Sequence, residues 1–220
     1  MTARELISET IIPLKPSDTG AYALGIMDEL RVSHLPIAGD EGFTGLISDT
    51  DIHTYNNYSE AIDKHPLSLL NAYINEDQHI FDVIRIIDAM KLTLLPVLDE
   101  KKQYLGSVTL PALSHHLAAL MNLNNPGGII ILELNDKDYL LTEIAQIVES
   151  NDAKVLGMYV ATFPDSTRME VTLKINKIDV GPILQTFTRY NYTIKASFSE
   201  DTYTESLQDR YNELMNYLNI

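Results

Sequence analysis

An internal repeat of about sixty residues is the feature that most constrains how this chain of 220 residues folds. The segment 34–37 (His-Leu-Pro-Ile) matches 94–97 (Leu-Leu-Pro-Val), and apolar residues at helical spacing precede both segments. After one inserted residue, the segment 45–48 (Gly-Leu-Ile-Ser) matches 106–109 (Gly-Ser-Val-Thr). A unit of this size buries little core alone, so we expect the two copies to pack as a pair.

Each copy predicts the same order of elements: an extended segment, an amphipathic helix, two short strands joined by a polar turn, and a closing helix. In the first copy the helix follows Ser48, and the earlier elements occupy 10–14, 18–31, 35–38 and 43–47. In the second copy the helix follows Thr109, and the earlier elements occupy 70–74, 79–91, 94–98 and 104–108.

This ordered set, present twice, resembles the CBS domain, and the pair resembles a tandem CBS (Bateman) module. The matching residues are Asp18-Thr19, the helix after them, Leu35-Pro36-Ile37 and Gly45-Leu-Ile-Ser-x-x-Asp51. We place the two repeats at 1–60 and 61–122. The resemblance implies a regulatory module that binds an adenosine-containing ligand between its repeats and often dimerises.

Ser48 and Asp51 have two interpretations. Ser-x-x-Asp at the start of a helix is close to a capping box, with Ser48 as the N-cap and Asp51 near the positive end of the helix dipole. The family resemblance implies that the Ser48 hydroxyl lies near the phosphate or ribose of a ligand. It also implies that Asp51 accepts hydrogen bonds from the ribose hydroxyls, as an ionised carboxylate does well. The two roles are compatible.

The two repeats differ where the ligand would bind. The residue before Leu-Pro, which the resemblance places close to the ligand's phosphates, is His34 in the first repeat and Leu94 in the second. The second repeat keeps a hydroxyl at Thr109 but has Ala112 in place of the carboxylate. We therefore expect one competent site and one degenerate site. A module that has lost ligand binding and serves as a dimerisation scaffold is an equal alternative.

We expect five candidate ligand-binding residues to converge on one cleft between the repeats: Ser48, Asp51, His34, Thr109 and Ile12. In this cleft, Ile12 forms an apolar wall for the base of the ligand.

A third unit follows the stretch 122–128, whose Asn, Pro and Gly residues predict a domain boundary. The pattern beyond it predicts strands and helices in the order βαββαβ, at 129–134, 140–150, 154–163, 169–175, 179–190 and 193–198. This order is ferredoxin-like, and the domain at 127–200 resembles an ACT domain, a regulatory module that often binds amino acids. ACT domains usually carry Asp-x-Pro-Gly after the first strand, whereas this chain has Asp-Lys-Asp-Tyr at 136–139. We therefore favour packing or pairing of sheets across a dimer over amino-acid binding.

The last segment, 201–220, predicts an amphipathic helix. Leu207, Tyr211, Leu214 and Leu218 recur at the spacing of one helix face. This stripe needs a partner surface, either on its own domain or on another subunit. The second arrangement would stabilise a dimer.

Composition excludes several classes of protein. A net charge of −15 argues against nucleic acid as a partner, because binding the phosphate backbone needs clustered Lys and Arg. The sequence has neither an apolar run of about 20 residues nor a signal peptide at its start, so we expect no membrane association. The absence of Cys rules out thiolate chemistry and fits a reducing cytoplasm.

The sequence has no motif that indicates catalysis or metal binding. His115 and His116 are adjacent and point to different faces of their helix, and His53, His65 and His79 lack partners at a zinc-ligand spacing. Neither a phosphate-binding loop nor a Gly-x-Ser-x-Gly elbow is present. We expect no enzyme, no metal site and no cofactor beyond a regulatory adenine nucleotide.

We therefore predict a mixed α/β (α+β) regulatory protein: a CBS pair, an ACT-like domain and a C-terminal helix, assembled as a cytoplasmic homodimer. The arrangement is similar to that of the acetoin-utilisation regulatory proteins of bacteria. The expected ligand is AMP, ADP, ATP or a related adenosyl compound. The sequence does not identify the downstream protein partner. A ligand-free interaction scaffold and an amino-acid sensor are the alternative functions.

Overall fold

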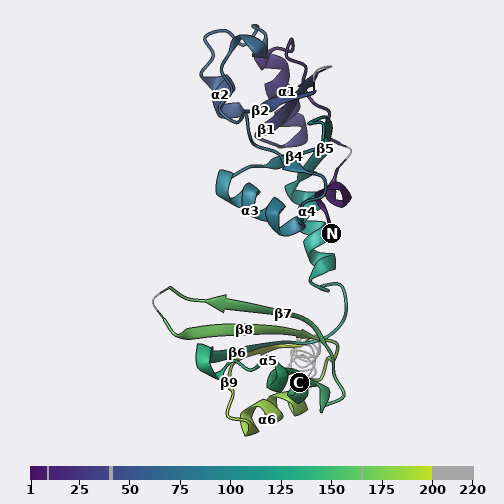
Figure 1. Ribbon diagram of the computed structural model, residues 1–220, viewed down its shortest axis with the longest axis vertical. Helices are drawn as coiled ribbons and strands as arrows, with labels where there is room; N and C mark the ends of the chain where they lie inside the picture. The colour runs from purple at the N-terminus through teal and green to yellow at the C-terminus, as the bar shows by residue number, and fades with distance from the viewer. Residues whose placement is uncertain (9, 40–41, 165, 200–220) are drawn as a thin grey trace, which may run out of the picture. The chain divides into compact units, whose positions relative to one another are not determined.

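A computed structural model describes residues 1–8, 10–39, 42–164 and 166–199 (Figure 1). Its contacts divide the chain into two compact units, Met1–Leu117 and Ala118–Ile220, and each unit is described by itself. The helix predicted at 201–220 lies outside the described residues.

The first repeat contains η1 (Ala3–Leu6), α1 (Gly20–Leu30), β1 (His34–Gly39), β2 (Gly42–Ser48) and α2 (Asp49–His53). The Thr19 side chain begins α1 by accepting a hydrogen bond from the Tyr22 N–H at 3.2 Å. Arg31 ends the helix in the left-handed conformation, with φ 54°. Within the predicted extended segment 10–14, the structure has a single parallel bridge from Leu14 to Ile37 rather than a continuous strand.

The second repeat contains η2 (Ile62–Lys64), β3 (Ile74–Asn75), α3 (Ile80–Met90), β4 (Leu94–Leu98), β5 (Tyr104–Thr109) and α4 (Leu110–Leu120). Its helix α3 begins and ends as α1 does, with a capping side chain at His79 and a left-handed residue at Lys91. The two repeats differ most in the closing helix, because α2 has 5 residues and α4 has 11.

The two hairpins have matching registers. His34 pairs with Ser48 in the first hairpin, and Leu94 pairs with Thr109 in the second. Both hairpins carry a register shift after the same repeat position, Ile37 in one and Val97 in the other. The repeat found in the sequence is therefore a structural repeat, and the predicted tandem fold is confirmed.

Each repeat receives the N-terminal segment of the other. The β-bridges that mark this exchange come in two equivalent pairs: Ser8–Ser107 with Leu46–Leu69, and Thr2–His79 with Thr19–Ala61. Leu6 and Ile62 enter a common hydrophobic core in this way, and both side chains are almost completely buried. The core therefore depends on both repeats, as expected for units too small to fold alone.

A glycine is required where an exchanged segment crosses β5. Gly106 has φ +153°, and a Cβ added to it would lie 2.4 Å from Cγ2 of Ile7. At the equivalent Gly45, an added Cβ would lie 3.0 Å from Cδ1 of Leu67. The exchanged segment thus lies directly on the hairpin in each repeat.

The second unit is a four-stranded antiparallel sheet with two helices. Its elements are β6 (Ile129–Asn135), η3 (Asp136–Asp138), α5 (Leu141–Glu149), β7 (Val155–Thr162), β8 (Arg168–Ile175), α6 (Gly181–Arg189) and β9 (Thr193–Phe198). The strand order is β7-β8-β6-β9, and every neighbouring pair is antiparallel. The predicted ferredoxin-like βαββαβ fold is confirmed.

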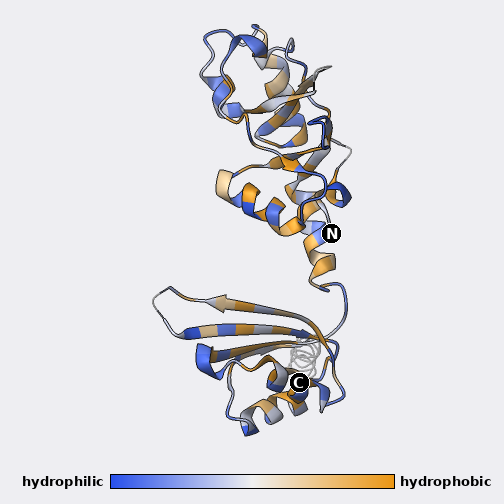
Figure 2. Cartoon of the chain, in the orientation of Figure 1, coloured by the Kyte–Doolittle hydropathy of each residue, from blue (hydrophilic) through white to orange (hydrophobic). Residues whose placement is uncertain are grey.

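Alternating residues divide this sheet into two faces. On β8, Met169, Val171, Leu173 and Ile175 are buried and belong to the same core as Phe187 of α6. Figure 2 shows the alternation of hydrophobic and hydrophilic residues along β8. Helices α5 and α6 cover the apolar face (Figure 1). Glu170 alternates with the buried residues of β8 and so lies on the opposite face.

Candidate ligand-binding site

Ser48 and Asp51 form a reciprocal capping box at the start of α2. The Asp51 N–H donates to Oγ of Ser48 at 3.0 Å, and the Ser48 N–H donates to Oδ2 of Asp51 at 3.2 Å. The capping interpretation of these residues is therefore confirmed. Asp51 is held in one orientation by its own helix, with its carboxylate beside the end of β2.

The Asp51 carboxylate also contacts the segment that the second repeat contributes to the first. Oγ of Ser68 donates to Oδ2 of Asp51 at 3.0 Å. Ser68 lies between Leu67 and Leu70 in the chain, and both of these leucines line a cavity of about 240 Å³. The other lining residues are Pro16, Ile37, Thr44, Ile62, Asp63 and His65. The segment 67–70 thus both contacts Asp51 and lines a largely aliphatic cavity.

A stacked pair of rings, of which one is buried and the other partly exposed, adjoins this cavity. The ring of Tyr55 stacks on that of His65, with centroids 3.5 Å apart and an interplanar angle of 11°. Tyr55 is 7% exposed, and its hydroxyl has no hydrogen-bond partner among the described residues. Burial and the nearby charge of Asp51 raise the pKa of Tyr55, so the group is a neutral donor at pH 7. The described residues therefore leave the hydrogen-bonding capacity of this buried hydroxyl unused.

His34 joins the two repeats. Its Nδ1 lies 3.0 Å from Oγ1 of Thr93 and accepts the Thr93 N–H at 3.3 Å, which assigns the ring proton to Nε2. Burial lowers the pKa of His34 against the opposing charges of Asp49 and Asp51. His34 is therefore neutral at pH 7.

Asp49 adds a second carboxylate beside His34. Burial alone would raise the pKa of Asp49, but hydrogen bonds to Ser33 and Thr50 outweigh it, and the pKa is lowered. Asp49 is thus ionised at neutral pH.

The equivalent place in the second repeat is built differently. Thr109 is 8% exposed, and its hydroxyl accepts the Ala112 N–H at 3.3 Å as a helix cap. Tyr104 places its hydroxyl 2.9 Å from Oγ of Ser107 and donates to the carbonyl oxygen of Ile11 at 3.3 Å. These bonds attach the exchanged segment to β5, whereas the first repeat has Phe43 at the position of Tyr104.

The structure groups the predicted residues unevenly. Ser48, Asp51 and His34 lie together at the end of the first hairpin. Thr109 holds the matching position in the second hairpin, paired with Leu94. Ile12 is 76% exposed and belongs to the exchanged segment that crosses the second repeat.

Sequence reasoning missed the residues that the second repeat brings to Asp51. Ser68, Leu67 and His65 come from the segment 65–69, which the pattern left without an assignment. The repeat offset was the available signal, because it maps Ile7 and Ser8 onto this segment. Only the tertiary structure shows that the N-terminal segment of each repeat packs on the other repeat.

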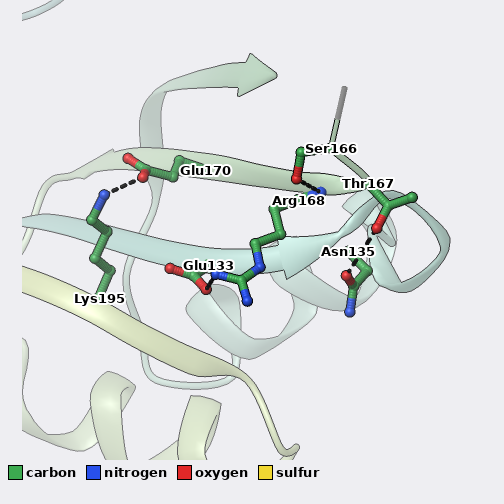
Figure 3. A network of polar contacts seen from close by, with 7 residues as sticks. All are labelled: Glu133, Asn135, Ser166, Thr167, Arg168, Glu170 and Lys195. Carbon is green, nitrogen blue, oxygen red and sulfur yellow. Dashed lines mark hydrogen bonds and ion pairs between the residues drawn. The ribbon is translucent and has the colours of Figure 1, made fainter. Parts of the chain in front are cut away.

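The second unit has a separate, more polar cavity of about 680 Å³. Its lining includes Glu133, Asp138, Glu143, Arg168 and Tyr192. Arg168 forms an ion pair with Glu133 at 3.6 Å, and the hydroxyl of Tyr192 donates to Oε2 of Glu143 at 2.7 Å. Figure 3 shows Arg168 and Glu133 side by side on the sheet, next to the ion pair of Lys195 with Glu170.

Among the described residues, no cluster of His, Asp and Glu could hold a metal ion. Within the same residues, no helix is long and apolar enough to cross a membrane.

A family model of the CBS domain matches residues 3–56 and 63–119, which is half of the chain. The chain therefore belongs to the CBS-domain family, and it carries two CBS domains in tandem. Inosine-5′-monophosphate dehydrogenase of Methanocaldococcus jannaschii is 23% identical over 109 residues, which are 49% of this chain. The match spans 22% of the length of that relative.

Solved structures of CBS domain pairs are also similar. A CBS domain pair/ACT domain protein of Thermotoga maritima has 18% identity and a TM-score of 0.49, over 54% of this chain and 98% of that one. CBSX2 in complex with AMP has 19% identity and a TM-score of 0.46, over 54% and 96% of the two chains. A CBS domain pair in complex with 5′-methylthioadenosine and S-adenosyl-L-methionine has 19% identity and a TM-score of 0.45, over 54% and 97%.

Proposed function

We propose that this protein is a non-catalytic regulator that binds an adenosine-containing ligand beside Asp51, between its two CBS domains. The observation that carries the proposal is the position of the Asp51 carboxylate. It is oriented by Ser48 and lies next to the segment that lines a cavity of about 240 Å³. An oriented acceptor beside an apolar cavity matches a nucleoside, which joins a flat aromatic base to a pair of ribose hydroxyls.

In this proposal the base enters the cavity lined by Leu67 and Leu70, and the ribose hydroxyls donate to Asp51. The free hydroxyl of Tyr55 adds a donor close to the same carboxylate. The second repeat contributes the segment of Ser68, but it has Ala112 at the position equivalent to Asp51. One ligand per chain is therefore expected.

The proposed mechanism is a shift of population between two arrangements of the repeats. A ligand held by Asp51 of one repeat and the segment of Ser68 from the other binds both at once. It therefore favours the arrangement in which the two approach each other. We propose that a cytoplasmic homodimer passes this change to its ACT-like domains, in an arrangement that resembles acetoin-utilisation regulatory proteins.

Thermal unfolding in the presence of adenosine, AMP, ADP, ATP and S-adenosylmethionine tests the proposal. A ligand at about 100 times its Kd stabilises the folded protein by roughly 2.7 kcal/mol, which raises Tm measurably. The variant Asp51→Asn keeps an oxygen that accepts the Ser48 N–H but loses the charge, so we expect a smaller ligand shift from a similar starting Tm.

The matched control is Asp88→Asn, which removes a charge from a side chain that is 79% exposed on α3. It should keep the full ligand shift. Equal shifts in wild type and Asp51→Asn would refute the role of Asp51, and no shift with any compound would favour the ligand-free scaffold.

The cavity of the second unit favours a second candidate function, the sensing of a free amino acid. Arg168 suits a carboxylate, and the nearby Glu133 and Glu143 suit an ammonium group. This function predicts stabilisation by amino acids that Arg168→Met abolishes, while adenosine compounds have no effect.

A further inference from the structure

Carboxylates surround the candidate site on more than one side. Asp49 and Asp51 lie in the first turn of α2, whose N-cap residue Ser48 pairs with His34 across the first hairpin. Asp63 lines the cavity, and Oε2 of Glu60 lies 3.4 Å from Nε2 of His65, another lining residue. A ligand that fills the cavity and reaches Asp51 therefore lies close to several carboxylates.

The site offers few positive charges to balance them. No residue that lines the cavity or bonds to the Asp51 side chain is a Lys or an Arg, among those that the structure describes. His34 is neutral at pH 7, because burial lowers its pKa. Arg31 shares a surface hollow with Asp49, but Asp28 lies in the same hollow. The balance of charge therefore stays negative.

The start of α2 does not reverse this balance. Backbone N–H groups at a helix start can attract anions, but α2 has only 5 residues, and its first turn carries Asp49 and Asp51. The Asp51 N–H already donates to Ser48. A phosphate would thus meet two carboxylates instead of free donors.

We infer that the ligand is an adenosine compound whose 5′ substituent is uncharged or cationic, a thioether or a sulfonium, rather than a nucleoside phosphate. The inference rests on the proposed function and selects the ligand class of that site. A doubly charged phosphate would enter the field of Asp49 and Asp51, where the charge of Arg31 is offset by Asp28. A thioether has no charge to repel, and a sulfonium is attracted to the same carboxylates.

Calorimetric titration of the full chain tests this choice, with adenosine, 5′-methylthioadenosine, S-adenosylmethionine, AMP and ATP as probes. EDTA is present so that no divalent cation bridges a phosphate to a carboxylate. We expect AMP to bind about tenfold more weakly than adenosine or 5′-methylthioadenosine at low salt, and ATP more weakly still. Tighter binding of AMP or ATP than of adenosine would overturn the inference and leave the proposed function standing. If none of the five compounds binds, both are wrong.

A pair of variants separates local repulsion from the overall charge of −15. Asp49→Asn removes a carboxylate at the site, and Asp88→Asn removes one from the exposed surface of the second repeat. Asp49→Asn should strengthen AMP binding several-fold without changing adenosine binding. Asp88→Asn should change neither affinity, and an equal gain for AMP in both variants would contradict the inference.

Discussion

Nδ1 of His34 lies 3.0 Å from the hydroxyl oxygen of Thr93, a contact that joins the two CBS domains at the point where each hairpin begins. The same hydroxyl accepts the Ser33 N–H at 3.1 Å. Ser33 and Thr93 are equivalent positions of the repeat, so the contact lies where the two copies meet. A change in the relative rotation of the repeats would alter the hydrogen bonds of His34, which faces Ser48 across the first hairpin.

Replacing Thr93 with Val should destabilise the protein by about 1–2 kcal/mol, because the partly buried Ser33 N–H loses its acceptor and His34 loses a partner. Urea unfolding gives this difference directly. Thr93→Ser is the control, since it keeps the hydroxyl and removes only a methyl group. If the two variants unfold at the same urea concentration, the hydrogen bonds contribute nothing.

Tyr104 should make stability sensitive to alkaline pH. Burial raises the pKa of Tyr104 from 10.0 to about 12, against the opposing effect of the hydrogen bond with Ser107. The folded state therefore favours the neutral phenol. Its contribution is fully present below pH 10, and up to roughly 2–3 kcal/mol is lost as the pH rises from 10 to 12.

The variant Tyr104→Phe isolates this contribution. At pH 8 it should be less stable than wild type by about 1 kcal/mol, because the bonds to Ile11 and Ser107 are gone. Phe does not ionise, so the difference between the two proteins should fall to zero and then change sign between pH 10 and 12, where Tyr104→Phe becomes the more stable protein. Unfolding free energies measured at several pH values would contradict the prediction if that difference stayed constant.

Gly106→Ala should destabilise the protein by about 2 kcal/mol or more. An alanine there needs an unfavourable φ of +153°, and its Cβ would lie 2.4 Å from Cγ2 of Ile7. Ile7→Ala removes the side-chain atom that clashes, so it should recover part of the loss in the double variant. Purely additive effects in the double-mutant cycle would show that Ile7 is not the cause.

Gly25→Ala should have the opposite effect. Gly25 lies inside α1, and an added Cβ meets no heavy atom within 4 Å. Alanine is favoured over glycine in a helix interior by about 0.5–1 kcal/mol, so Tm should rise by a few degrees. A fall in Tm would mean that the exposed face of α1 contacts another molecule, such as a second subunit.

The local elements followed from the sequence because their causes are local. The helix predicted at 18–31 forms as α1, and both predicted hairpins form, at 35–38 with 43–47 and at 94–98 with 104–108. The βαββαβ order of the second unit was equally readable, since its alternating strands face one core. The capping box of Ser48 and Asp51 depends only on residues three apart.

The contents of the candidate site were less predictable. The sequence indicated Ser48, Asp51 and His34 together, because they lie on one hairpin and the helix after it. It could not indicate Ser68, His65 or Tyr55, whose contacts join positions with no shared pattern. The hydrogen bond from Tyr104 to the carbonyl oxygen of Ile11 was unpredictable for the same reason.

The sequence by itself determined that this chain contains two CBS domains and a ferredoxin-like domain, because repeated apolar spacing and turn residues act over short distances along the chain. The tertiary structure decided that each N-terminal segment packs on the other repeat, and so which residues reach Asp51. The physical reason is that neither repeat can bury its own core. The exchange that completes both cores brings together residues that the sequence keeps apart.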